Sequence, residues 1–157
     1  MKIKLIAMAH TSQSFIQEGL EEYSKRLKNF VSFEFIPIKD IKNAKNLSME
    51  ELKKKEGEEI IKLLENGDHI VLLDDKGKMY TSMQLADFIL KKQNLSTKTL
   101  VFIIGGAYGF SEEVYARSKE KLSLSPLTFS HQMIRMIFAE QLYRAYSIIH
   151  HLPYHHE

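Results

Sequence analysis

Runs of consecutive apolar residues alternate along the chain with segments in which apolar residues recur every three or four positions. The runs predict strands, and the three-to-four spacing predicts amphipathic helices. The expected strands are 3–9, 31–38, 70–73, 100–104 and 121–124, and the expected helices are 15–27, 48–64, 82–92, 111–119 and 132–149. This alternation predicts an α/β fold with a mostly parallel sheet flanked by helices.

Short local signals refine the ends of these elements. Pro37, close to the end of the second strand, indicates an edge strand, because proline cannot donate to a neighbouring strand. Ser48 and Glu51 have the spacing of a capping box, so a helix is expected to begin at Ser48. The segment DDKGK, residues 74–78, is expected to turn.

The expected helix over 132–149 is apolar nearly all round. Its apolar members are Met133, Ile134, Met136, Ile137, Phe138, Leu142, Tyr143, Tyr146, Ile148 and Ile149. A helix without a wide polar face has to be buried on more than one side. In a chain this small, the sheet is expected to cover one side and a second copy of the protein the other, which predicts a homodimer.

Composition narrows the class of protein further. A length of 157 residues, of which 44% are hydrophobic and 27% charged, predicts one globular domain over 1–157. The net charge of +2 is too small to attract nucleic acid over long range, so any such contact has to be local. The absence of cysteine excludes disulfides and thiolate chemistry. No stretch is long and apolar enough for a membrane span, and the N-terminal segment does not resemble a secretory signal, so a cytoplasmic protein is expected.

A glycine-rich segment, GGAYG at 105–109, follows one apolar strand directly and precedes a helix that Ser111 opens. In open parallel sheets, ligands bind at the carboxyl ends of strands, and glycines there let the main chain approach a ligand. A cofactor loop and a plain tight turn both fit this pattern. The spacing matches neither GxGxxG nor a P-loop, which argues against dinucleotides and nucleoside triphosphates.

The segment LSLSPLTF, residues 122–129, runs from a strand into a polar loop before the last helix. Its main-chain amides and carbonyls could pair with a planar ring of a ligand, or the segment could be an ordinary connection. His131 and Arg135, four residues apart, share a helix face. One of them could hold an anion, and the other could pair with Glu140 or with a carbonyl.

Histidines gather at the C-terminal end, where His150, His151, His155 and His156 fall within the last eight residues. Clustered histidine is typical of metal binding or of acid–base chemistry near neutral pH, although a frayed chain end is the simpler interpretation. No carboxylate completes a set of ligands, so no metal is expected. Arg144, inside the apolar helix, could pair with Glu140 or contact a ligand.

Taken together, four strings are specific enough to indicate a family. The strings GGAYGF, LSLSPLTFSHQMIR, AEQLYRAYSI and PYHHE resemble the RlmH family, the SPOUT-class methyltransferases that modify pseudouridine in large-subunit ribosomal RNA. The opening KIKLIAMA and the segments EYSKRL and KEGE are also similar to that family, so the resemblance covers the whole chain.

The resemblance implies a deep C-terminal trefoil knot, S-adenosylmethionine as methyl donor, and a homodimer with its active site at the interface. Carried over by position, the family's cofactor contacts fall on Leu73, Gly105, Leu124, Ser125, Pro126, Leu127, Thr128 and Phe129. The family's catalytic and substrate-side residues match Arg144, Tyr154 and His155.

The implied reaction methylates ring nitrogen N3 of a pseudouridine in 23S ribosomal RNA. This nitrogen has to lose its proton before it can act as a nucleophile. His155 could accept that proton, Arg144 could stabilise the negative oxygens or hold a phosphate, and Tyr154 could orient or stack on the base. Two other classes stay open: a non-catalytic ribosome-binding or assembly factor, and a small metal-binding protein that uses the histidine tail.

Overall fold

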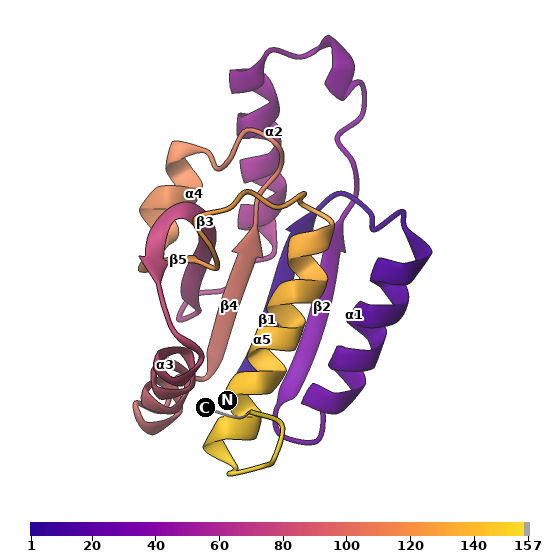
Figure 1. Ribbon diagram of the computed structural model, residues 1–157. Helices are drawn as coiled ribbons and strands as arrows, with labels where there is room; N and C mark the ends of the chain where they lie inside the picture. The colour runs from indigo at the N-terminus through magenta and orange to yellow at the C-terminus, as the bar shows by residue number, and fades with distance from the viewer. Residues whose placement is uncertain (156–157) are drawn as a thin grey trace.

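The structure, a computed structural model, describes residues 1–155 and is built on a five-stranded sheet (Figure 1). The strands are β1 (Lys2–Met8), β2 (Ser32–Ile38), β3 (His69–Met79), β4 (Thr99–Ile104) and β5 (Glu120–Ser123). All four neighbouring pairs are parallel, in the order β2-β1-β4-β3-β5. The prediction of a parallel α/β sheet is therefore confirmed.

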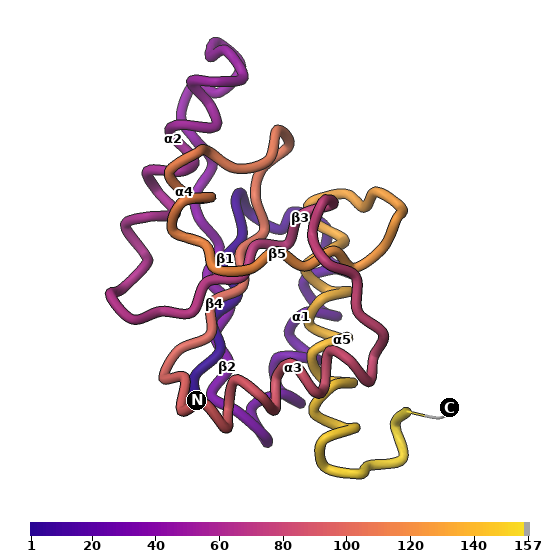
Figure 2. Tube along the Cα trace, turned by 90° about the vertical axis from the view of Figure 1, so that its left-hand side faces the viewer, coloured from indigo at the N-terminus to yellow at the C-terminus, as the bar shows by residue number. Residues whose placement is uncertain are grey.

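Helices cover both faces of the sheet. They are α1 (Ser14–Leu27), α2 (Met49–Lys62), α3 (Ser82–Asn94), α4 (Glu112–Arg117) and α5 (Met133–Ile149), with a short 3-10 helix η1 (Ala44–Asn46) that the sequence did not predict. Figure 2 shows α1, α3 and α5 on one side of the sheet and α2 and α4 on the other. Adjacent residues of β4 pack on opposite faces of the sheet: Phe102 belongs to the hydrophobic core under α5, and Ile103 to the core under α2 and α4.

Two of the local signals are confirmed. β2 is an edge strand, as Pro37 indicated. At the start of α2, the Ser48 hydroxyl accepts a hydrogen bond from the Glu51 amide at 3.2 Å, and the Glu51 carboxylate accepts one from the Ser48 amide at 2.8 Å. These reciprocal bonds satisfy two amide donors that the first helical turn leaves free.

The turn predicted at 74–78 is wrong, because β3 continues to Met79. Leu73 and Lys78 both pair with Leu122 of β5, so the strand bulges between them. Gly77 lies so close to β5 that a Cβ on it would stand 2.5 Å from the Leu122 carbonyl carbon. The glycine that suggested a turn thus permits a close approach of two strands.

Helix α5 lies over the sheet between α1 and α3 (Figure 1). The Phe138 ring packs on that of Phe102 in β4, with centroids 4.6 Å apart. Gly19 lets α1 approach, since a Cβ there would stand 2.3 Å from the Met136 sulfur. Helices of the same chain therefore cover part of the apolar surface that the sequence assigned to a second copy. Met133, Ile137 and Ile148 stay partly exposed.

Among residues 1–155, no helix has both the length and the apolar character that crossing a membrane requires.

Candidate cofactor site and substrate-side residues

A cavity of about 590 Å³ opens at the carboxyl edge of the sheet. Its walls come from three neighbouring strands: the ends of β4 and β5 with the connections that follow them, and the bulged part of β3. They consist of residues 73–76, 104–110, 122–125 and 127–131 with Tyr115 and Ile134. The volume falls within the range of about 300–1,000 Å³ typical of small-molecule sites. Its position matches the general location of ligands in open parallel sheets.

The register of the sheet explains why these segments meet. Leu73 of β3 pairs with Ile104 on one side and with Leu122 on the other. Gly105 after β4 and Leu124 after β5 consequently leave the sheet on the two sides of β3, close to the level of Leu73. The parallel register thus brings three segments that are distant in sequence to one cavity.

Most of the predicted cofactor residues line this cavity. They are Leu73, Gly105, Leu124, Ser125, Leu127, Thr128 and Phe129. Pro126 is the exception and does not belong to the lining. Local bonds shape this stretch, because the Ser125 hydroxyl accepts a hydrogen bond from the Leu127 amide at 2.9 Å, and the Ser123 hydroxyl donates to the Ser125 carbonyl at 3.1 Å. These bonds fix the course of the chain on both sides of Pro126, which is exposed.

The glycine loop closes on itself beside this segment. The Gly109 amide donates to the Gly106 carbonyl at 3.2 Å, and Gly109 has φ +80°, a conformation that favours glycine. A Cβ on Gly105 would stand 3.1 Å from the Phe110 ring. The loop is thus a tight turn that also forms a cavity wall, so the two interpretations of its sequence are compatible.

The sequence did not single out two polar residues of the cavity, Asp74 and Tyr115, whereas His131, which it named as a candidate for holding an anion, does line the cavity. The Tyr115 hydroxyl donates to the Asp74 carboxylate at 2.6 Å, and the Lys76 amide donates to the other Asp74 oxygen at 2.8 Å. Burial, reinforced by the carboxylate of Asp74, raises the pKa of Tyr115 well above its ordinary value. The sequence position of Asp74 could have indicated its place at the cavity, since Asp74 directly follows Leu73, a predicted cofactor residue.

Arg135 does not hold an anion; it pairs with carbonyls, one of the two roles that the sequence left open. The residue is fully buried, and its guanidinium donates to the carbonyls of His131 (2.9 Å) and Met8 and to the Thr11 hydroxyl at 2.7 Å. Burial lowers the pKa of Arg135. This side chain therefore ties the start of α5 to the end of β1.

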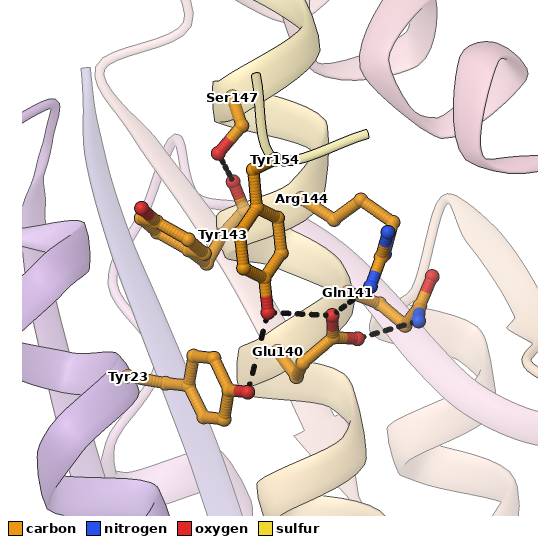
Figure 3. Close-up of polar contacts among 7 residues, drawn as sticks. All are labelled: Tyr23, Glu140, Gln141, Tyr143, Arg144, Ser147 and Tyr154. Atoms are coloured by element: carbon orange, nitrogen blue, oxygen red, sulfur yellow. Dashed lines mark hydrogen bonds and ion pairs between the residues drawn. The ribbon is translucent and has the colours of Figure 1, made fainter. Parts of the chain in front are cut away.

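The C-terminal tail forms a second polar cluster, on the far half of α5 (Figure 3). The Tyr154 hydroxyl lies 3.2 Å from a Glu140 carboxylate oxygen and 3.3 Å from the Tyr23 hydroxyl. Arg144 donates to the same Glu140 oxygen at 2.6 Å, and its guanidinium carbon lies 4.9 Å from the centre of the Tyr154 ring. Burial, reinforced by Tyr23 and Glu140, raises the pKa of Tyr154. The ion pair between Arg144 and Glu140, one of the two roles that the sequence left open for Arg144, is present.

This tail cluster does not line the cavity of the same chain. Ile134, at the cavity, and Arg144 are ten residues apart on α5, or about 15 Å along the helix axis. A smaller cavity of about 190 Å³ lies between them, with Phe129 on its wall near the larger cavity and Gln141 on its wall near the cluster. The structure therefore gathers the predicted cofactor residues in one place and Arg144 and Tyr154 in another.

The remaining histidines of the tail are His155 and His156, which the sequence considered for metal binding. His155 is half-buried, whereas His156 lies outside the described residues. Within residues 1–155, no three histidine or carboxylate side chains gather as a potential metal site.

The open parallel sheet, with a ligand-sized cavity at the bulge of β3 and the ends of β4 and β5, defines an α/β protein with a candidate small-molecule site. The chain belongs to the SPOUT methyltransferase family, since the family described as "Predicted SPOUT methyltransferase" matches residues 1–155. This finding confirms the resemblance seen in the sequence.

Relatives that match over the full chain have consistent names. A protein from Parabacteroides distasonis is 54% identical over all of both chains, and one from Christiangramia forsetii is 47% identical over 99% of each. Both are named "Ribosomal RNA large subunit methyltransferase H".

A solved structure shares the fold. A probable methylase family protein from Haemophilus influenzae Rd KW20 aligns over 99% of this chain and 70% of its own, with a TM-score of 0.52 and 11% identity.

Proposed function

We propose that this protein is an S-adenosylmethionine-dependent methyltransferase, cytoplasmic and homodimeric, that methylates N3 of a pseudouridine in 23S ribosomal RNA of the large subunit. The observation that carries the proposal is the cavity at the bulge of β3 and the ends of β4 and β5, where seven of the eight residues expected to contact the cofactor meet. The names of the relatives support the choice of ribosomal RNA as substrate.

The cavity has the features that this cofactor requires. Its glycine loop permits close main-chain approach, and Leu73, Leu124 and Phe129 supply an apolar environment for a planar ring. When bound there, the sulfonium of S-adenosylmethionine supplies an electrophilic methyl group. The protein's own task is to hold the acceptor nitrogen in line at about 3 to 3.5 Å from that carbon.

The tail cluster has the chemistry for the acceptor side. His155 supplies an imidazole, the commonest general base in proteins, which can take the proton from N3. Arg144 can then stabilise the negative charge on the ring oxygens or hold a phosphate, and Tyr154 can stack on or orient the base. In this assignment Glu140 fixes the orientation of Arg144 through the 2.6 Å ion pair.

The separation of the two groups supports an active site shared between subunits. Cofactor residues lie at the beginning of α5 and Arg144 and Tyr154 towards its end, so a second subunit could place its tail at the cavity of the first. The partly exposed Met133, Ile137 and Ile148 provide apolar surface on α5 for such a dimer. The trefoil knot implied by the family belongs to the same proposal.

Two measurements test the proposed function. Large-subunit ribosomal RNA from cells with and without the gene is digested to nucleosides and compared by mass spectrometry; loss of one methylated pseudouridine is expected without the gene. Purified protein is expected to melt at a higher temperature with S-adenosylmethionine and to be unaffected by zinc. An unchanged nucleoside profile would favour an assembly factor, and stabilisation by zinc alone would favour a metal-binding protein.

A further inference from the structure

A carboxylate without a partner lies directly beneath the glycine loop. Glu56 of α2 is only 9% exposed, and its Oε2 atom is buried without a hydrogen-bond donor among the described residues. A Cβ on Gly106 would stand 2.4 Å from both Glu56 carboxylate oxygens. The side chain is therefore packed against the main chain of the loop, on the side away from α5.

The neighbouring residue secures this placement. Gly57 lets α2 approach the beginning of α4, since a Cβ on it would stand 2.2 Å from the Ser111 hydroxyl oxygen. That hydroxyl accepts a hydrogen bond from the Val114 amide at 3.4 Å and so caps α4. Glu56 and Gly57 together form the floor under the loop and under the helix that follows it, which gives the KEGE segment a structural purpose.

Burying a carboxylate without a donor lowers stability, because it loses water and gains nothing in return. Desolvation by burial accordingly raises the pKa of Glu56. An apolar side chain of similar size would fill the same space without this cost. Buried polar groups that lower stability are often kept for function.

The loop above contains possible donors. Within residues 1–155, the main-chain amides of Ala107 and Tyr108 have no acceptor at hydrogen-bonding distance, and both residues are exposed. A small rotation of the loop towards the ligand could turn one of its amides to Glu56. A hydrogen bond formed only in that state would favour it over the open one.

We propose that Glu56 is a positioning residue for the cofactor loop, whose carboxylate accepts a hydrogen bond from a main-chain amide of residues 106–108 when the loop closes on the ligand. The inference rests on the proposed function, which makes S-adenosylmethionine that ligand. Glu56 itself does not line the cavity, so it acts through the loop.

The test separates affinity from stability. Calorimetric titration with S-adenosylmethionine and thermal unfolding without it are measured for the parent, Glu56→Met and Glu56→Gln. Glu56→Met is expected to unfold at a temperature equal to the parent's or about 2 °C higher, yet to bind about 10- to 100-fold more weakly. Glu56→Gln, which keeps one acceptor oxygen, is expected to lose less affinity than Glu56→Met.

Glu58→Met and Glu58→Gln are the matched controls, since Glu58 is an exposed glutamate on the same helix. These controls are expected to change neither the affinity for S-adenosylmethionine nor the unfolding temperature. Parental affinity in both Glu56 variants would overturn the inference, as would parallel losses of affinity and stability in Glu56→Met, which indicate a merely structural role. A parent that does not bind S-adenosylmethionine would overturn the proposed function together with the inference.

Discussion

The hydroxyl of Tyr154 lies 3.2 Å from a carboxylate oxygen of Glu140, fourteen residues earlier in the chain. The same oxygen accepts a hydrogen bond from Arg144, and the rings of Tyr143 and Tyr154 pack edge to face with centroids 4.8 Å apart. Up to Tyr154, the tail is therefore docked on α5 and is not a frayed end. A docked tail presents its side chains at a fixed place on the surface of α5 (Figure 3).

A chain cut after Leu152 is expected to lose methyl transfer to ribosomes while it still binds S-adenosylmethionine and still dimerises. The reason is that the cut removes Tyr154 and His155 but leaves the cavity and α5 in place. Calorimetry, sedimentation and transfer of a labelled methyl group to ribosomes measure the three properties. Transfer at the parental rate would show that the tail has no part in the reaction.

Mixed dimers test whether the tail acts across the subunit boundary. One subunit carries Gly105→Val, whose branched side chain crowds Phe110 in the cavity wall; the other ends at Leu152. Each homodimer is expected to be inactive, whereas the mixed dimer regains activity because it contains one intact site. Thermal unfolding first establishes that the Gly105→Val protein is folded. Continued inactivity of the mixed dimers would place the tail at the cavity of its own subunit.

His155→Ala is expected to lower the single-turnover rate of methyl transfer by about 10²- to 10⁴-fold, the usual effect of removing an acid–base group. Binding of S-adenosylmethionine should stay at the parental value, because His155 is assigned to the RNA base. His151→Asn serves as control: this neighbouring histidine is exposed, and its φ of +54° suits asparagine. Equal rates in the two variants would remove His155 from the mechanism.

Arg135→Met is expected to lower the free energy of unfolding by about 2 kcal/mol or more. Removing a buried charge is favourable, but the change leaves the Met8 carbonyl and the Thr11 hydroxyl without their donor, and this second effect is the larger. Denaturant unfolding measures the difference. Arg117→Met, at an exposed arginine, should leave stability unchanged; a similar loss there would argue against the buried bonds as the cause.

The contribution of Glu120 to stability is expected to disappear in acid. Burial alone would raise the pKa of its carboxyl, but hydrogen bonds from Lys92 and His69 outweigh that effect and hold the pKa below its ordinary value. A carboxyl whose pKa is lowered in the folded protein stabilises the fold at pH values above its pKa in the unfolded chain, about 4.3. This stabilisation is lost as the pH falls through the pKa of the folded protein. The difference in unfolding free energy between the parent and Glu120→Gln should therefore shrink from about pH 7 to pH 3. A constant difference would contradict this assignment.

The sequence alone determined the elements and their order. Apolar spacing predicted all five strands and the five α-helices, because each element repeats its contacts with the core at a period set by its own backbone. The position of GGAYG after a strand predicted a loop at the carboxyl edge of the sheet, and this loop does line the cavity, since parallel strands run to a common edge. The family strings then selected Leu73 and residues 124–129, of which all but Pro126 line the cavity.

Only the tertiary structure decided which distant residues meet. Glu56 lies about fifty residues before the loop that it supports, and Arg135 contacts Met8 across most of the chain. Nothing in a local pattern encodes such pairs, because they depend on the order of strands in the sheet and on which helices share a face. The same reason explains the bulge at 74–78, where composition indicated a turn but pairing with β5 extended the strand. Periodicity in the sequence reports the secondary structure of each segment, whereas the site forms where segments from different parts of the chain pack together.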